Sequence, residues 1–167
     1  NERFVELSEK GYRVIAVAAK EIAAKKEYSK SDEAGLAFLG CGDSLAAALS
    51  AQQISNHTAI ALDPNEAILN PAVLDGRRLF LISVSGRTSA NIKAGRIGKE
   101  IGCRVTAITA NPGSRLAREA DDLIELKFRS VGALTSGTVS FTTSLLACFH
   151  VLGSKPRLPS LGATLRK

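Results

Sequence analysis

The sequence predicts an α/β domain of the doubly wound class, with a five-stranded parallel sheet covered by helices on both faces. Two observations predict this class. Five short apolar runs lack the polar–apolar alternation of a strand that faces water on one side, so each is expected to be buried on both faces. Segments with apolar residues at helical spacing lie between these runs. A chain of 167 residues is long enough for one domain with a single good core.

The expected elements alternate along the chain, after an N-terminal segment rich in Ala and Lys whose apolar residues also recur at helical spacing. The expected strands are residues 36–42, 58–63, 78–84, 104–110 and 122–128. The expected helices are residues 43–56, 63–68, 88–101, a short helix within 111–120, and 139–153.

Local signals mark the starts of two of these helices. Asp43 or Ser44 is placed to cap the helix that follows the first strand. After the second strand, Asp63 is expected as the N-cap, Pro64 as the first helical residue and Glu66 as the third, which is the layout of a capping box.

We divide the chain into three parts. Residues 1–34 form an N-terminal helical segment, residues 35–153 the α/β domain, and residues 154–167 a basic tail or linker. The chain begins with Asn1 and contains no methionine, so we expect it to be a piece of a longer protein.

The amino-acid composition limits the kinds of ligand and partner that we expect. The net charge of +6 favours anionic ligands, but the basic residues are dispersed and Trp is absent, so no nucleic-acid partner is expected. No apolar run is long enough to span a membrane, and a cytoplasmic location without membrane contact is expected. The three cysteines are widely spaced and are expected to be reduced and packed among apolar residues, with no metal or other cofactor.

The turn after the third strand carries the strongest chemical signal. Residues 83–89, SVSGRTS, place four hydroxyl side chains at the start of a helix, where unpaired backbone amides also gather. Gly86 allows a ligand to approach the backbone closely, and Arg87 adds positive charge at the rim. One hydroxyl would suffice to cap the helix, so four in seven residues favour an anion such as phosphate.

Two common phosphate-binding motifs do not account for this turn. A Walker A sequence is absent. A dinucleotide fingerprint would use Gly40 and Gly42, but its third glycine position is occupied by Leu45. Nicotinamide or flavin binding is therefore a poor alternative.

Three segments together resemble a known family. LAFLGCGDS, then LISVSGRTSANIKAGRIGKEIGCRVTAIT, then SGTVSFTTSLL are similar to an SIS (sugar isomerase) domain, from about Leu36 to Leu152. This is the fold of the isomerase half of glucosamine-6-phosphate synthase and of other aldose–ketose phosphosugar isomerases. The resemblance, to the first SIS domain of two-domain isomerases in particular, implies a flavodoxin-like sheet that binds a phosphorylated sugar and pairs with a second SIS domain or a homodimer partner.

The resemblance also implies roles for individual residues. Ser83, Ser85 and Thr88 would hold the phosphate. The sugar would be lined by residues from three turns: Gly42, Asp43, Ser44, Val84, Thr135, Ser136 and Thr138. The loop from Thr135 to Thr138 would close over the sugar.

Two positions depart from the family pattern. Val84 stands where the synthase-like members have a glutamine that touches sugar hydroxyls, and Val139 stands where they have a lysine. We therefore expect an intact phosphate site with altered sugar contacts.

Aldose–ketose isomerisation needs a group that moves a proton between adjacent carbons. The resemblance offers Glu66, which follows the second strand in a turn that some single-domain SIS isomerases use for a catalytic carboxylate; its alternative role is the capping box. His57 and His150 are expected to be surface or packed histidines.

Three hypotheses follow from the sequence. The leading one is a phosphosugar-binding part of an aldose–ketose isomerase of the aminosugar type, completed by a second SIS domain or subunit. The second is a sensor module that binds a sugar phosphate without chemistry. The third is a self-sufficient isomerase that uses Glu66.

Overall fold

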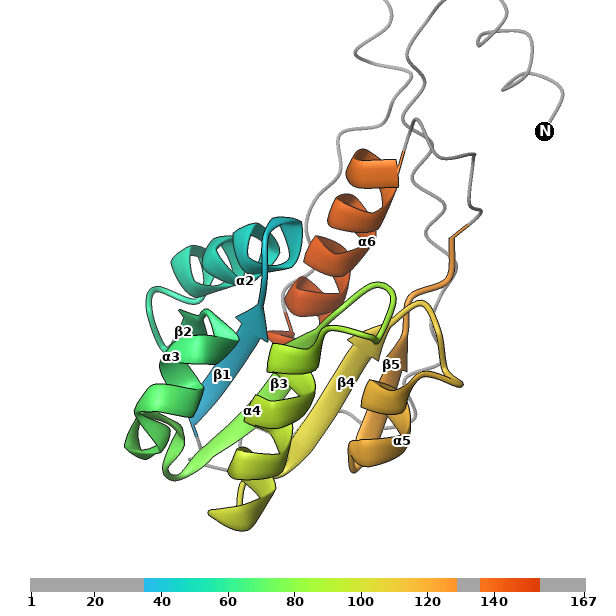
Figure 1. Ribbon diagram of the computed structural model, residues 1–167. Helices are drawn as coiled ribbons and strands as arrows, with labels where there is room; N and C mark the ends of the chain where they lie inside the picture. Colours follow the sequence, from blue (N-terminus) through green and yellow to red (C-terminus); the bar gives the residue numbers. More distant parts are fainter. Residues whose placement is uncertain (1–34, 129–135, 154–167) are drawn as a thin grey trace, which may run out of the picture.

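The computed structural model describes residues 35–128 and 136–153 and confirms the predicted class (Figure 1). The strands are β1 (Gly35–Gly40), β2 (Ala59–Leu62), β3 (Arg77–Ile82), β4 (Val105–Thr109) and β5 (Asp122–Glu125). They form one five-stranded sheet in the order β2-β1-β3-β4-β5, and every neighbouring pair is parallel. The predicted N-terminal segment 1–34 and tail 154–167 lie outside the described residues.

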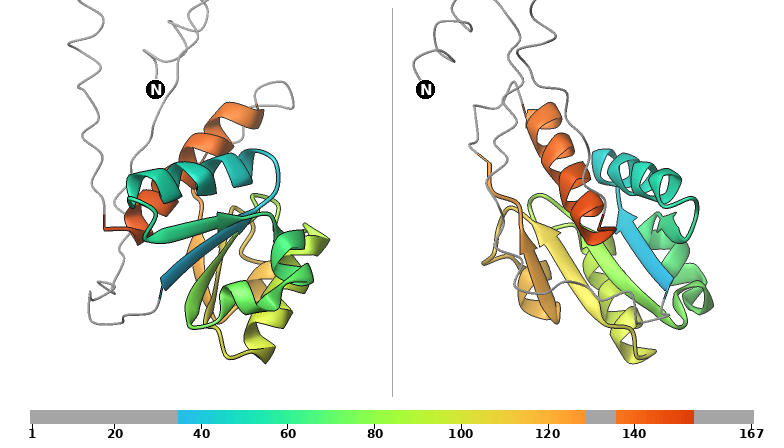
Figure 2. Two further views of the ribbon diagram at one scale, coloured as in Figure 1. Left: turned by 90° about the vertical axis from the view of Figure 1, so that its left-hand side faces the viewer. Right: turned by 180° about the vertical axis from the view of Figure 1, so that it is seen from behind.

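Helices cover both faces of this sheet (Figures 1 and 2). They are α2 (Asp43–Ile54), α3 (Pro64–Leu69), α4 (Ser89–Glu100), α5 (Arg115–Glu119) and α6 (Ser136–Val151), with a 3₁₀ turn at Pro71–Leu74 that the sequence did not predict. Helices α2 and α6 lie on one face, and α3, α4 and α5 lie on the other. None of the helices described here is long and apolar enough to cross a membrane.

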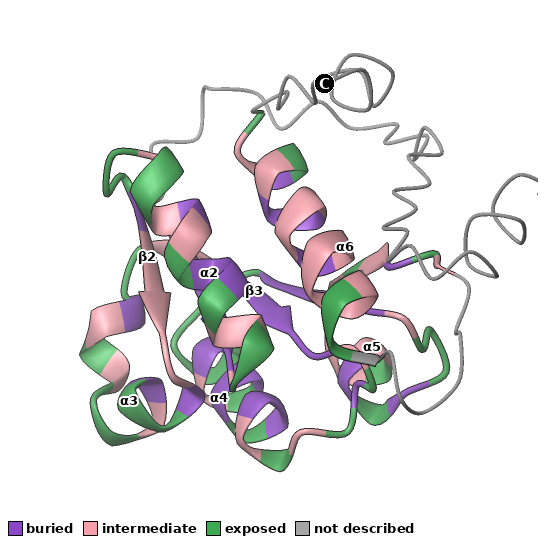
Figure 3. Ribbon diagram, turned by 90° about the horizontal axis from the view of Figure 1, so that it is seen from above, coloured by how far each residue is buried: buried purple, intermediate pink, exposed green. Residues whose placement is uncertain are grey.

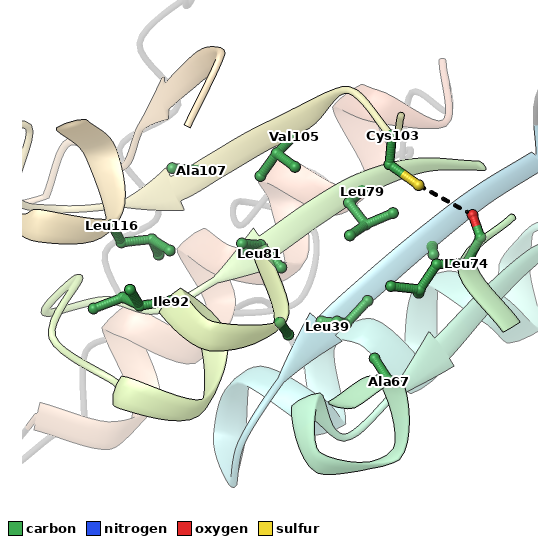
Figure 4. Packing of buried hydrophobic residues seen from close by; sticks show 12 residues of the cluster. Leu39, Ala67, Leu74, Leu79, Leu81, Ile92, Cys103, Val105, Ala107 and Leu116 are labelled. Atoms are coloured by element: carbon green, nitrogen blue, oxygen red, sulfur yellow. Dashed lines mark hydrogen bonds between the residues drawn. The ribbon is translucent and has the colours of Figure 1, made fainter. Parts of the chain in front are cut away.

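The two faces of β3 enter two separate hydrophobic clusters. Leu79 and Leu81 join the cluster under α3, α4 and α5 (Figure 4), whereas Phe80 and Ile82 join the cluster under α2 and α6. Successive side chains of a strand point to opposite faces, so both sets must be apolar. This double burial explains why the strand sequences lack polar alternation, and it makes β3 a buried centre of the fold (Figure 3).

Two glycines bring α4 close to β3. A Cβ added at Gly95 would lie 2.6 Å from Leu81 Cδ1, and one added at Gly98 would lie 2.5 Å from Leu79 Cδ2. The helix therefore rests directly on the side chains of β3, and its first turn is held firmly above the end of that strand.

The predicted N-cap is confirmed for α3 but not for α2. Asp63 caps α3 by accepting a hydrogen bond from the Asn65 amide at 2.9 Å, with Pro64 as the first helical residue. At α2 the prediction was wrong: the N-cap is Gly42, and no side chain makes a capping hydrogen bond. The left-handed backbone of Gly42, with φ of 56°, turns the chain directly into the helix and places Asp43 inside its first turn.

The three cysteines are free thiols. Cys103 and Cys148 are buried as predicted, and burial raises the pKa of the Cys148 thiol to about 12. The Cys103 thiol donates to the Leu74 carbonyl at 3.2 Å (Figure 4). Cys41 is only half-buried and belongs to the candidate site.

A pair of leucine substitutions tests the packing of the sheet. Leu39 is fully buried under the α3–α4–α5 layer, whereas the Leu69 side chain is 85% exposed. We expect Leu39→Ala to lower the free energy of unfolding by about 2–5 kcal/mol and Leu69→Ala by less than about 0.5 kcal/mol. Urea unfolding followed by circular dichroism measures both. Equal losses from the two variants would contradict the described core.

Candidate anion-binding site at the end of strand β3

The site lies where the connections of the sheet diverge. From β1 the chain passes through α2 to the edge strand β2, whereas from β3 it passes through α4 to β4 on the opposite side. Gly40 pairs with Ile82 at the ends of β1 and β3, so the loops after these strands start side by side. In open parallel sheets, ligands bind beyond the carboxyl ends of the strands at such a switch point.

The segment 83–88, here called the serine loop, is a tight turn held by its own hydroxyl groups. The Ser83 and Thr88 hydroxyl oxygens lie 2.9 Å apart and share a hydrogen bond across the loop. The Gly86 amide donates to the Ser83 carbonyl at 2.9 Å. Ser83 is buried, while Ser85 is exposed and accepts a hydrogen bond from the Arg87 amide at 3.3 Å.

Helix α4 starts without a side-chain cap. Thr88 occupies the N-cap position, but its hydroxyl is directed to Ser83 and makes no capping hydrogen bond. The first amide to bond back to the helix start is that of Ile92, on the Thr88 carbonyl at 3.2 Å. The three preceding helical amides have no acceptor among the described residues. No hydroxyl of the serine loop therefore caps α4. Free amides at the positive end of a helix dipole are groups that favour an anion.

Gly86 is required by the packing behind the loop. Its φ of 64° lies in the left-handed region, which favours glycine. A Cβ at this position would overlap the Ser114 side chain and lie 3.0 Å from Thr109 Oγ1. The loop between β4 and α5 therefore supports the serine loop from behind. Sequence reasoning assigned Thr109 to a strand and Ser114 to a turn and did not identify this contact.

The loop after β1 contributes the second wall. A Cβ added at Gly40 would lie 2.7 Å from the Ser44 backbone, so β1 and α2 approach each other closely. Asp43 is exposed, and a Cβ added at Gly137 would lie 3.6 Å from its carboxylate oxygen, which puts the start of α6 next to the start of α2. The two helix N-termini thus converge on Asp43.

The predicted loop around residue 135 is only partly described. Thr135 lies outside the described residues, and Ser136 begins α6, three residues before the expected helix start. Thr138 therefore belongs to the first turn of α6 and is exposed. Further along, the hydroxyls of Thr142 and Thr143 donate to carbonyls of their own helix at 2.8 and 2.7 Å.

Val84 differs from its neighbours in the serine loop. It is half-buried, and its side chain packs against the apolar cluster that contains Phe38 and Phe80. A polar residue here would have to leave that cluster to reach a ligand. The valine therefore fits an apolar boundary of the site.

Glu66 lies in the first turn of α3, at the same edge of the sheet as the serine loop. It is exposed, and among the described contacts the Asp63 amide does not donate to its carboxylate, so the reciprocal capping-box bond is not formed. Helix α3 packs against α4 on the same face of the sheet, but Glu66 makes no hydrogen bond or ion pair with the serine loop among the described residues. His57 and His150 are both exposed, in agreement with a surface assignment.

Cys41 lies in the loop after β1, near Asp63 at the end of β2. Burial raises the pKa of the Cys41 thiol, and the nearby Asp63 carboxylate raises it further. The thiol is therefore harder to ionise than an exposed cysteine. A half-buried position near a carboxylate differs from the purely apolar packing that the sequence predicted for Cys41. Within the described ranges no three His, Cys, Asp or Glu side chains cluster as metal ligands would.

Comparison with curated proteins finds relatives that act on sugar phosphates. The chain is 32% identical over 92 residues to the phosphoheptose isomerases of Mycobacterium tuberculosis and Mycobacterium bovis, a match that covers 52% of this chain and 47% of theirs. It is 32% identical over 84 residues to a glutamine–fructose-6-phosphate aminotransferase (isomerizing) of Clostridium acetobutylicum, covering 50% of this chain and 14% of that protein. The chain thus spans about half the length of the isomerases that it matches. No family model matches the chain.

Solved structures share the fold. An Escherichia coli CFT073 protein, solved as a complex, matches with a TM-score of 0.62 and 22% identity, covering 72% of this chain and 68% of that one. The Vibrio vulnificus NanR protein complexed with ManNAc-6P matches with a TM-score of 0.59 and 21% identity, covering 72% and 47%. The sequence relatives and the shared fold confirm the resemblance to SIS-type phosphosugar isomerases.

The support behind the serine loop is tested by comparing two glycines. Gly86 and Gly76 have nearly the same φ, 64° and 63°, but a Cβ at Gly76 meets no atom within 4 Å. We expect Gly76→Ala to cost about 1–2 kcal/mol of unfolding free energy from backbone strain alone. Gly86→Ala should cost about 1–3 kcal/mol more, because it also forces Ser114 and Thr109 away. Equal losses in denaturant unfolding would show that the β4–α5 loop does not support the serine loop.

Proposed function

We propose that this chain, which resembles SIS-type phosphosugar isomerases in sequence and fold, binds a phosphorylated sugar and forms part of an aldose–ketose isomerase of the aminosugar type. The uncapped start of α4 beside three hydroxyl groups is the observation that carries the proposal. A phosphate dianion accepts several short hydrogen bonds from different directions, and this arrangement supplies such donors from one turn of the chain.

The phosphate is assigned to Ser83, Ser85 and Thr88 together with the first amides of α4. The Ser83–Thr88 hydrogen bond holds two hydroxyls in place before the ligand arrives, which reduces the entropy lost on binding. The Arg87 side chain is exposed at the same loop and adds positive charge near the phosphate.

The sugar is assigned to the neighbouring loops. Gly42, Asp43 and Ser44 lie at the start of α2, beside the serine loop, and Asp43 offers a carboxylate that accepts sugar hydroxyls. Val84 adds an apolar boundary, and Ser136 and Thr138 belong to the first turn of α6, which begins next to Asp43. Thr135 lies outside the described residues. The match to an isomerizing aminotransferase named for fructose 6-phosphate supports a hexose 6-phosphate or its amino derivative as the ligand.

Isomerisation requires a proton to leave the carbon next to the carbonyl and to return to the former carbonyl carbon. Glu66 is the carboxylate that we assign to this transfer within the chain, because it is exposed at the correct edge of the sheet and is not used in a capping box. A second SIS domain or a second copy of the chain would complete the site. No cofactor takes part in this scheme.

A sensor that binds a sugar phosphate without chemistry is the second candidate function. Glu66 makes no hydrogen bond to the serine loop among the described residues, which favours a site without a positioned base. The structural likeness to NanR, a protein solved with ManNAc-6P, supports the binding of a sugar phosphate, which this candidate shares with the isomerase.

Phosphate recognition is tested by titration calorimetry with hexose and hexosamine 6-phosphates and with the corresponding unphosphorylated sugars. We expect the wild-type protein to prefer the phosphorylated sugar by at least about 30-fold, since several charge-assisted hydrogen bonds contribute. Ser85→Ala combined with Thr88→Ala should abolish most of this preference. The matched control is Ser50→Ala with Thr58→Ala, whose hydroxyls bond only to nearby carbonyls. A wild-type protein without preference for the phosphorylated sugar would refute the proposed function.

The role of Glu66 is tested by turnover of a ketose phosphate by the full-length protein. Glu66→Gln should lower kcat by about 100-fold or more and leave fructose 6-phosphate affinity within about twofold. Glu100→Gln, an exposed glutamate at the end of α4, is the control and should retain turnover. Full turnover by Glu66→Gln would assign the proton transfer to another group, and binding without turnover in the wild-type protein would favour the sensor.

A further inference from the structure

The carbonyl of Val84, in the middle of the serine loop, is held by two donors from the end of β4. The Ala110 amide donates to it at 3.0 Å, and the Thr109 hydroxyl donates to it at 3.1 Å. A carbonyl oxygen has two lone pairs, so both are occupied. This peptide unit therefore has little freedom to rotate.

Fixing this carbonyl also fixes the next amide. The described chain has no cis peptide bond, and in a planar trans peptide the C=O and the following N–H point in opposite directions. The Val84 carbonyl faces the β4–α5 connection, so the Ser85 N–H faces away from it, on the open side of the loop. The Ser85 amide has no acceptor within residues 35–128 and 136–153.

The surroundings of Thr109 direct its hydroxyl proton to the Val84 carbonyl. It is fully buried, and its hydroxyl oxygen accepts a hydrogen bond from the Asn111 amide at 3.2 Å. Because that bond uses a lone pair, the hydroxyl proton remains available for the Val84 carbonyl. The adjacent Gly86 carbonyl is held from the same side by the Leu116 amide at 3.2 Å.

We propose that Thr109 is a positioning residue of the phosphate site, which aims the Ser85 amide at the phosphate through the Val84 carbonyl. This inference rests on the proposed function. Thr109 is buried beneath the loop and does not touch the ligand. Its contribution is to preorganise one backbone donor, and a preorganised donor costs no rearrangement on binding.

The test uses titration calorimetry of the full chain with two probes, fructose 6-phosphate and inorganic phosphate. Thr109→Val keeps the shape of the side chain and removes the donor. It is expected to lower the affinity for both probes by about tenfold, which is the effect of misaligning one hydrogen bond to a charged group. Thr109→Ser keeps the hydroxyl, and its affinity for both probes should lie within about twofold of the wild-type affinity. Thr106→Val, a buried threonine near the other end of β4, is the matched control and should also be unchanged.

Three outcomes would overturn the inference. The first is a folded Thr109→Val protein with wild-type affinity for both probes, while Ser85→Ala with Thr88→Ala still loses the phosphate preference; this leaves the proposed function intact. The second is equal weakening by Thr109→Val and Thr109→Ser, which would indicate packing and not the hydroxyl. The third is a wild-type protein that binds neither probe, which would overturn the proposed function as well.

A measurement on the wild-type protein covers the case in which Thr109→Val does not fold. The Ser85 amide proton signal is followed by ¹⁵N-resolved NMR as fructose 6-phosphate is added. A downfield shift that saturates with binding is expected, because the amide donates to an anionic oxygen. A saturating complex in which this signal stays in place would refute the positioning role.

Discussion

The parallel pairing of β1 with β3 joins the two halves of the sheet, and the arrangement of the site depends on it. The chain leaves β1 in one direction and β3 in the other, so no crossover covers the point where these strands end. The loop beginning at Cys41 and the serine loop beginning at Ser83 meet there because Gly40 and Ile82 are in register. The buried side chains of β3 on both faces hold this pairing in place.

Where the loops after β1 and β3 meet, backbone amides lack a hydrogen-bond acceptor among the described residues. Thr88 would normally cap α4, but its hydroxyl is paired with Ser83, and the first amides of the helix remain without an acceptor in the described part of the chain. The β4–α5 connection supports this arrangement from below by filling the space behind Gly86 and holding the Val84 carbonyl. The geometry of the proposed anion site is thus built before any ligand is present.

The sequence was sufficient to predict the sheet, because burial on both faces leaves apolar runs without alternation, as in Phe80 and Leu81. It also placed the serine loop between a strand and a helix, because the apolar run ends there and apolar residues at helical spacing follow. It did not predict the hydrogen-bond partner of each hydroxyl. The pairing of Ser83 with Thr88 depends on the turn at Gly86. The hydroxyl that supports the Val84 carbonyl comes from Thr109, 25 residues further along the chain. Contacts of this kind depend on strand order, which local patterns do not specify.

The same distinction applies to helix starts. Asp63 caps α3 as predicted because Pro64 fixes the first helical residue. Asp43 does not cap α2 because the turn at Gly42, with its positive φ, starts the helix one residue earlier.

A crystal structure of the full protein with fructose 6-phosphate tests the account most directly. It should show phosphate oxygens about 2.7–3.1 Å from the Ser85 amide and the first amides of α4. A phosphate bound at any other helix start, or only through surface lysines and arginines, would contradict it.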